Sequence, residues 1–277
     1  MTDEPRIRPL TRAEMDVALD WAAAEGWNPG LADADCFRRA DEAGFLGLFL
    51  AGHMVASISV VAYDAAFAFL GLYIVAPAFR GQGFGLKLWQ AGMASLGDRI
   101  VGLDGVVAQQ ANYAKSGFHL AWNNQRYEGR GGGSEPSGLV PLAAVPFAAL
   151  AAYDRGLFPA PRDRFLACWS ERHPGRAILE AGKLRGFGVI RRCRLGWKIG
   201  PLFADTPAYA EALFVGLAAL APGEPVFLDV PQPNAAAVAL TERHGMTPCF
   251  ETARMYAGGR PELPLARIFG ITTLELG

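Results

Sequence analysis

The sequence predicts an α/β (α+β) protein of two tandem domains, each a mixed, mostly antiparallel twisted sheet flanked by helices, the second a degenerate copy. Strand-like and helical runs follow one another in a similar order in both halves of the 277 residues. Between the halves, the stretch 131–138 is glycine-rich and polar, as linkers are. We therefore expect domains at 1–130 and 139–277.

Three anchors support a duplication. They recur in the same order at shifts of 125 to 130 residues: Gly52 with Gly182, Asp104 with Asp229, and Gly117 with Gly245. A nearly constant shift is typical of an internal repeat. Chance similarity between two α/β halves is the alternative.

The first half begins with a helix. Thr11 is the expected N-cap, and Glu14 completes a capping box before apolar residues recur at helical spacing. Residues 45–75 then predict three strands in an antiparallel meander, because two short turns interrupt an otherwise β-rich run. The elements expected after it are a glycine loop, a helix over 84–96, a buried strand at 99–107, a short helix at 109–117, and one or two closing strands at 118–129.

The loop "RGQGFG" at 80–85 is the most informative segment. No Lys-Ser or Lys-Thr follows it, as a Walker loop requires, and its Gly-x-Gly-x-Gly spacing differs from the dinucleotide fingerprint. Its glycines leave the backbone open, and the first amides of the following helix are unpaired and carry the positive end of its dipole. The loop predicts a pyrophosphate cradle with Arg80 at its rim. The alternative is a turn that only lets strand and helix pack tightly.

Two motifs carry a family resemblance. Arg80, Gly83 and Gly85 match the Gln/Arg-x-x-Gly-x-Gly/Ala signature of the GNAT N-acetyltransferase superfamily, and "LYIVAPAF" before them resembles its fourth strand. "YAKSGF" at 113–118 resembles the "YEKxGF" of the same superfamily. The resemblance covers residues 6–130, and the tandem arrangement is similar to that of the YitH-like two-domain acetyltransferases.

The resemblance implies an acetyl-CoA-dependent N-acetyltransferase that transfers an acetyl group to a primary amine of a small molecule by direct attack on the thioester. Tyr113 is then the acid that reprotonates the thiolate, or else a packing residue. The strand before the loop holds no carboxylate, so Asp104 is the nearest base, or else a turn cap. The implied cofactor-binding residues are Leu72, Ile74, Val75, Arg80, Gly81, Gln82, Gly83, Phe84 and Gly85.

The second half is expected to have lost the cofactor and to complete the substrate site, with a purely structural, dimer-like partner as the alternative. Opposite the glycine loop it has "ADTPAY" at 204–209, which holds no glycine, and opposite Tyr113 it has Thr241. The expected substrate residues are Trp27, Asn28, Asp229 and Asn234. The net acidity of segment 25–42 weakly favours a cationic amine as the acceptor substrate. A non-catalytic acyl-CoA-binding regulatory module is the alternative function.

Composition limits the partners. The net charge is −1 and no basic stripe is present, so we expect no nucleic-acid partner. Apolar runs are too short to span a bilayer and no signal peptide is visible, so we expect no membrane association and a cytoplasmic location.

The isolated histidines predict no metal. The four cysteines lack a Cys-x-x-Cys pair and are expected to be buried free thiols, with a metal or disulfide framework as the alternative. The expected assembly is a homodimer or a pseudo-dimeric monomer.

Overall fold

The computed structural model describes residues 4–277 and shows the same order of elements twice. The first half contains β1 (Arg6–Pro9), α1 (Arg12–Ala24), α2 (Asp33–Ala40), β2 (Phe45–Leu50), β3 (His53–Ala62), β4 (Phe67–Val75), α3 (Phe84–Leu96), β5 (Ile100–Val106), α4 (Gln110–Ala114) and β6 (His119–Arg130). The second half contains β7 (Leu139–Pro141), α5 (Phe147–Arg155), α6 (Asp163–Arg172), β8 (Gly175–Glu180), β9 (Lys183–Arg192), β10 (Trp197–Ala204), α7 (Pro207–Ala218), β11 (Pro225–Pro231), α8 (Ala235–Arg243) and β12 (Thr247–Ala257). A C-terminal tail follows and carries β13 (Ile268–Gly270).

Local sequence rules set several of these boundaries. The Thr11 hydroxyl accepts a hydrogen bond from the Glu14 amide at 3.3 Å, and the Glu14 carboxylate accepts one from the Thr11 amide at 2.8 Å. This is the predicted capping box at the start of α1. The helix expected over 84–96 begins and ends at the predicted residues, and the meander expected over 45–75 is β2, β3 and β4.

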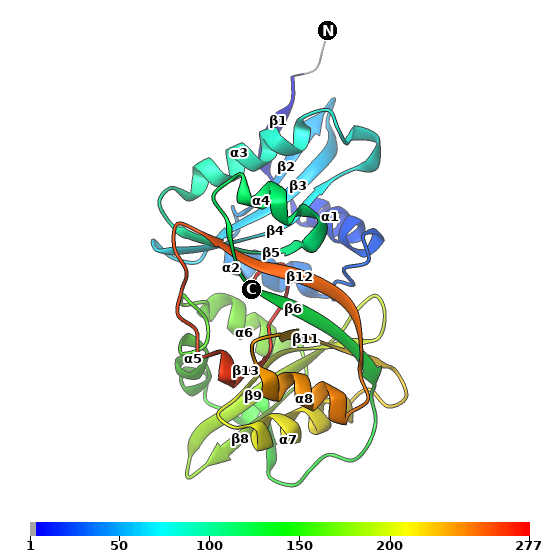
Figure 1. Cartoon of the computed structure of the whole chain (residues 1–277), viewed down its shortest axis with the longest axis vertical. Helices are drawn as coiled ribbons and strands as arrows, with labels where there is room; N and C mark the ends of the chain where they lie inside the picture. Colours follow the sequence, from blue (N-terminus) through cyan, green and yellow to red (C-terminus); the bar gives the residue numbers. More distant parts are fainter. Residues whose placement is uncertain (1–3) are drawn as a thin grey trace.

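The two halves exchange their last strands. The sheet order is β1-β2-β3-β4-β5-β12-β6-β11-β10-β9-β8-β7, so β12 of the second half lies between β5 and β6, and β6 of the first half pairs with β11. Figure 1 shows β6 and β12 side by side between the upper and lower halves. The predicted boundary at 131–138 stays a prediction, because one continuous sheet joins both halves.

Two equivalent buried ion pairs hold the exchanged strands. Arg254 of β12 donates to both carboxylate oxygens of Asp104 in β5, at 2.7 and 2.6 Å. In the same way, Arg126 of β6 donates to both oxygens of Asp229 in β11, at 2.7 and 2.9 Å. Both pairs are buried. Removing one partner of such a pair leaves an uncompensated buried charge and costs about 3–5 kcal/mol. The aspartate that recurs as Asp104 and Asp229 therefore binds the exchanged strand in each half.

Separate halves should not fold. A chain of residues 1–130 lacks β12, so the edge of β5 and the carboxylate of Asp104 lose their partners. We expect residues 1–130 expressed alone to show no cooperative thermal unfolding by circular dichroism, whereas both halves expressed together form a folded complex. Cooperative unfolding of the isolated first half would contradict the strand exchange.

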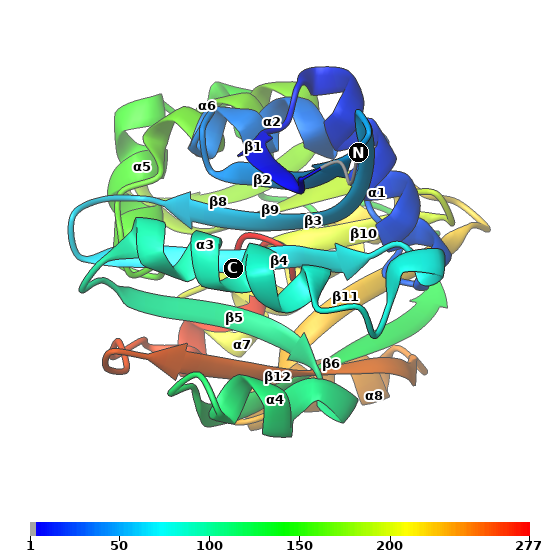
Figure 2. The ribbon, with the colours of Figure 1, turned by 90° about the horizontal axis from the view of Figure 1, so that it is seen from above.

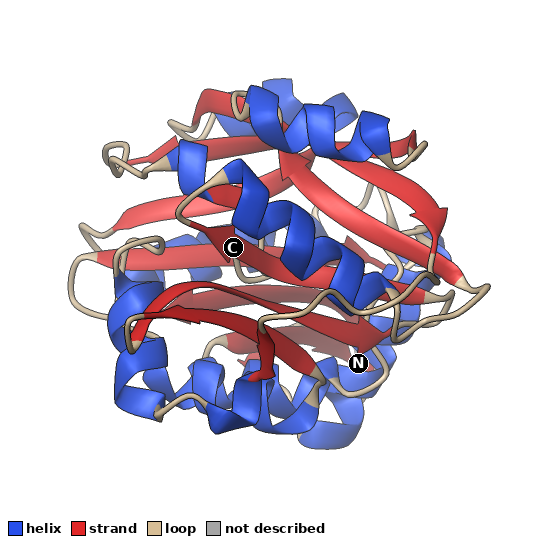
Figure 3. Ribbon diagram, turned by 90° about the horizontal axis from the view of Figure 1, so that it is seen from below, coloured by secondary structure: helices blue, strands red, loops and turns tan. Residues whose placement is uncertain are grey.

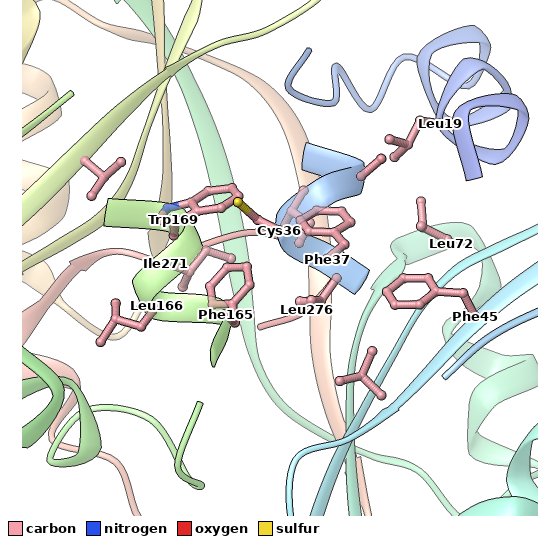
Figure 4. Packing of buried hydrophobic residues seen from close by; sticks show 14 of the residues in the cluster. Leu19, Cys36, Phe37, Phe45, Leu72, Phe165, Leu166, Trp169, Ile271 and Leu276 are labelled. Atoms are coloured by element: carbon pink, nitrogen blue, oxygen red, sulfur yellow. The ribbon is translucent and has the colours of Figure 1, made fainter. Parts of the chain in front are cut away.

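Helices cover both faces of the sheet (Figures 2 and 3). In the first half, α3 and α4 pack on one face and α1 and α2 on the other, each with its own apolar cluster. The cluster on the α1 face continues into the second half. Figure 4 shows its members from three parts of the chain: Leu19, Phe37, Phe45 and Leu72 from the first half, Phe165, Leu166 and Trp169 from the second, and Ile271 and Leu276 from the tail. Across residues 4–277, no helix has the length and hydropathy to cross a bilayer.

The prediction that all four cysteines are buried free thiols was wrong for one pair. Cys36 of α2 and Cys168 of α6 form a disulfide between the two halves, with Cα atoms 5.4 Å apart. Only Cys193 and Cys249 are free among the described residues, and Cys249 is exposed rather than buried. The pairing was not visible in the sequence because the two residues are 132 positions apart and meet only where α2 packs on α6.

Candidate active site

A gap opens between the parallel strands β4 and β5. Their pairing runs from Phe67–Ile100 to Leu70–Leu103 and stops there, although both strands continue. At the same level β4 has a bulge, because Ser59 pairs with Gly71 but Ser57 pairs with Ile74. Leu72 in the bulge has a φ of 46°, which is uncommon for a residue with a side chain. The buried Ser57 hydroxyl donates to the Leu72 carbonyl at 2.9 Å and fixes the bulge.

A small cavity lies at this gap. Apolar and aromatic side chains dominate its lining, as in most small-molecule sites. The lining residues are Trp27, Leu70, Gly71, Leu72, Tyr73, Leu103, Asp104, Gly105, Val106, Tyr113, Phe250, Thr252, Leu274 and Glu275. They come from both halves, because β12 brings Phe250 and Thr252 and the tail brings Leu274 and Glu275.

Tyr113 lies in this lining with its ring stacked on Trp89 of α3 at 5.6 Å between centroids. A side chain at Gly105 would collide with the Tyr113 ring, so glycine on β5 leaves the space that the phenol occupies. Burial raises the pKa of Tyr113 to about 12, with a smaller contribution from neighbouring Tyr73. The phenol therefore stays protonated at neutral pH.

The glycine loop places the N-terminus of α3 beside the gap. Gly83 is the N-cap with φ 82°, a conformation that side chains disfavour. Because glycine has no side chain with which to cap the helix, the first amides of α3 face outward unshielded. A side chain at Gly85 would meet the Tyr73 hydroxyl at 2.7 Å, so this end of α3 packs closely on β4. The cradle thus has the open amides and the dipole end that a phosphate requires.

The other predicted cofactor residues surround this cradle. Arg80 donates to the Val75 carbonyl at 2.9 Å and pairs with Glu25, so it ties the loop to the end of β4 and to α1. The Gln82 amide donates to the Ala78 carbonyl at 3.0 Å. Among the β4 residues, Leu72 lines the cavity. Ile74 and Val75 lie farther along the same strand toward the cradle, whose loop also contains Gly81 and Phe84.

Arg126 of the exchanged strand β6 and residues of the second half hold the predicted substrate residues Trp27 and Asn28. Arg126 donates to the Trp27 carbonyl at 2.8 Å, and the buried Lys198 ammonium donates to the Asn28 carbonyl at 2.9 Å. The Asn28 side chain bonds the backbone of Leu195 at 2.8 and 2.9 Å. Trp27 lines the cavity, so contacts with the second half position one of its walls.

The remaining predicted residues are engaged elsewhere. Asp104 borders the cavity, but Arg254 and Asn124 occupy its oxygens. Asp229 and Asn234 lie outside the cavity lining. Asn234 caps α8 and donates to the carbonyls of Leu265 and Ile268, which holds the start of the tail.

The acidic side chains of segment 25–42 do not face the cavity. They pair as Glu25 with Arg80, Asp33 with Arg191, Asp35 with Arg12 and Arg172, and Glu42 with Arg164, while Asp41 accepts from the Ala43 and Ala62 amides. The structure therefore gives no support to the predicted preference for a cationic amine. In the part of the chain that the structure describes, no group of three or more His, Cys, Asp or Glu side chains is placed to hold a metal ion.

The corresponding gap in the second half is filled by the chain itself. Strands β10 and β11 pair in parallel from Trp197–Val226 to Ile199–Leu228, and beyond this point β13 of the tail pairs with β10. The Ile271 amide next to β13 donates to the Asp229 carbonyl of β11 at 3.0 Å. The Thr206 hydroxyl also caps the N-terminus of α7. The second half thus has neither an open gap nor an open helix end.

Comparisons with known proteins give the family. The acetyltransferase (GNAT) family model matches residues 10–119, and a second acetyltransferase (GNAT) domain model matches residues 150–270. The chain is 33% identical over 275 residues to "Holothin acyltransferase" of Pseudoalteromonas sp. (strain SANK 73390), covering 98% of this chain and 94% of the relative. The chain belongs to the GNAT superfamily. As a GNAT protein it is an acyltransferase with two GNAT domains.

Solved structures share the GNAT fold over the whole chain. A putative acetyltransferase from Pyrococcus horikoshii has a TM-score of 0.85 at 22% identity, covering 99% of this chain and 96% of that one. A tandem GNAT protein from the clavulanic acid biosynthesis pathway has a TM-score of 0.62 at 15% identity, covering 94% and 100%. A GCN5-related N-acetyltransferase from Sphaerobacter thermophilus also has a TM-score of 0.62, at 17% identity, covering 94% and 97%.

The cavity residues supplied by the second half and the tail could not be predicted from the sequence. Phe250 and Thr252 reach the first half only through the strand exchange. Leu274 and Glu275 lie in the short tail "ITTLELG", which has neither helical nor strand periodicity. The single local clue was its apolar composition, because a free C-terminal tail would be expected to be polar.

Proposed function

We propose that this chain transfers the acetyl group of acetyl-CoA to a primary amine of a small molecule. The observation that carries the proposal is one cavity at the β4–β5 gap, with a protonated phenol in its lining and an open helix N-terminus beside it. An acyl-CoA needs both a place for its extended arm and a site for its pyrophosphate.

The residues of the first half fit the donor. The loop from Arg80 to Gly85 and the first turn of α3 would hold the pyrophosphate through backbone amides. The backbone of Leu72, Ile74 and Val75, where β4 leaves β5, would bond the arm like an added strand. Acetyl-CoA supplies an activated thioester.

Tyr113 serves as the acid. As the new C–N bond forms and the C–S bond breaks, its hydroxyl gives a proton to the sulfur, whose thiol has a pKa of about 8.5. A phenol with a pKa of about 12 stays protonated until the thiolate develops. A backbone amide at the β4 bulge would stabilise the oxyanion.

The acceptor is a small amine on an apolar scaffold. Trp27, Phe250 and Leu274 give its side of the cavity aromatic and aliphatic walls, and no free cluster of carboxylates in the described residues selects a polycation. The acyltransferase that is 33% identical is named for holothin, and acceptors of this kind are the first to test. We further propose that the chain works in the cytoplasm as a pseudo-dimeric monomer, its two halves forming one site.

Thiol release separates this function from an acyl-CoA-binding regulatory module. The full chain is mixed with acetyl-CoA and a panel of amines that includes holothin, aromatic amines and polyamines, and free CoA is followed with a thiol reagent. We expect amine-dependent release with at least one apolar amine. CoA binding without release across the panel would favour the regulatory module.

A further inference from the structure

We propose that Glu275, in the C-terminal tail, is the general base that takes the proton from the acceptor amine. This inference rests on the proposed acyl transfer, and it supplies the group that β4 lacks. In the first half, β4 carries only apolar residues, glycine and one tyrosine.

The tail reaches the active site through the second half. After β13 fills the gap beside β10, the chain passes between the halves and lies on β4, where a side chain at Gly71 would collide with the Glu275 carbonyl. The Tyr63 hydroxyl donates to the Leu276 carbonyl at 2.8 Å, and the Leu276 amide donates to the Thr273 hydroxyl at 2.9 Å. These bonds hold Glu275 on both sides at the level of the β4 bulge.

The Glu275 carboxylate is buried without partners. Its residue is 2% exposed, and neither oxygen has a hydrogen-bond partner among residues 4–277. The buried arginines between the halves have other ion-pair partners, Arg126 with Asp229 and Arg191 with Asp33. The charge of Glu275 acts on both only as a smaller contribution that raises their pKa, and neither forms a hydrogen bond with its carboxylate. Burying a carboxylate without hydrogen-bond donors costs on the order of several kcal/mol, so its presence at this place needs a reason other than stability. Its position in the cavity lining supplies one.

Glu275 and Tyr113 approach the gap from opposite faces of the sheet. Tyr113 packs in the apolar cluster beneath α3, whereas Leu274 and Leu276 on either side of Glu275 belong to the cluster on the α1 face. The acid is thus on the side of the cradle and the carboxylate on the side of Trp27, where we place the acceptor. Asp104 is not available as the general base, because Arg254 binds both of its oxygens.

The proton balance is complete with these two groups. The amine nitrogen bonds to the acyl carbon and loses one proton to Glu275, while the C–S bond breaks and the sulfur gains one from Tyr113. After product release, Glu275 loses its proton to water and the Tyr113 phenolate regains one from water. The net reaction needs no further reagent.

The test replaces the carboxylate by its uncharged isostere in the full chain. We expect Glu275→Gln to lower kcat at least 100-fold, since a general base contributes about 10²–10⁴-fold. The Kd for CoA should stay at the wild-type value, and the thermal midpoint should stay the same or rise, because glutamine buries no charge at this position. Glu262→Gln is the matched control, because Glu262 is an exposed carboxylate in the same tail. In Glu275→Ala, added formate should restore turnover at least tenfold by standing in for the missing carboxylate.

Three results would separate the explanations. Turnover of Glu275→Gln within threefold of wild type, with chemistry rate-limiting, would overturn the role of Glu275 alone. A loss that comes with weaker CoA binding or a lower thermal midpoint, without formate rescue of Glu275→Ala, would make Glu275 structural and also overturn it. A wild-type chain that acetylates no amine would instead overturn the proposed function.

Discussion

Replacing Tyr113 by phenylalanine should lower kcat by about ten- to a thousand-fold and leave the Kd for CoA unchanged. The substitution removes one hydroxyl and keeps the ring that stacks on Trp89, so packing beneath α3 is preserved. A proton donated only as the thiolate leaves acts in the transition state, and its loss therefore falls on the rate of the chemical step. Single-turnover acetylation, compared with CoA titration, measures the two effects separately.

Tyr73→Phe is the matched control for this change. Tyr73 lines the same cavity, but its hydroxyl lies against Gly85 at the end of α3. We expect it to keep turnover within threefold of wild type. Because burial raises the pKa of Tyr113 to about 12, wild-type activity should also show no loss from phenol ionisation between about pH 7 and 10. Equal single-turnover rates for wild type and Tyr113→Phe would reduce Tyr113 to a packing residue.

Replacing Gly83 by valine should abolish measurable CoA binding, with at least a hundredfold rise in Kd. A β-branched residue at the observed φ of 82° is strained by about 1–2 kcal/mol or more, so the loop shifts away from its cradle geometry. The added side chain also covers amides that the phosphates need. Isothermal titration with CoA measures the change.

Gly97→Val controls for backbone strain. Gly97 ends the same helix with a φ of 60°, at the terminus opposite the cradle. It should lower the thermal midpoint about as much as Gly83→Val and leave CoA affinity within threefold of wild type. Unchanged affinity in Gly83→Val, with the loop still folded, would show that the donor binds elsewhere.

Local sequence patterns predicted the parts of the fold that local interactions determine. The capping box of Thr11 and Glu14, the helix over 84–96 and the meander of β2 to β4 are set by neighbours in the chain. The glycine loop before α3 and Tyr113 could also be singled out, because their motifs are contiguous, and their roles in binding and catalysis stay predictions. The strand exchange was not predictable, since a single strand such as β6 carries no information about which half supplies its partners.

Pairing across the exchange also determines what the predicted site residues do. Asp104 looks like a base in isolation, and only β12 reveals that Arg254 neutralises it. Glu275 looks like an exposed carboxylate near a chain end, and only the path of the tail brings it into the cavity lining. Burial and partners, rather than residue type, decide which carboxylate is available.

The number of CoA molecules bound by the full wild-type chain shows whether only the first half binds the donor. The first half has an open β4–β5 gap and an uncapped α3, whereas β13 fills the β10–β11 gap and Thr206 caps α7. Isothermal titration should therefore give one site per chain. Two equivalent sites per chain, or one site that survives Gly83→Val with unchanged affinity, would contradict a single donor site at the glycine loop of the first half.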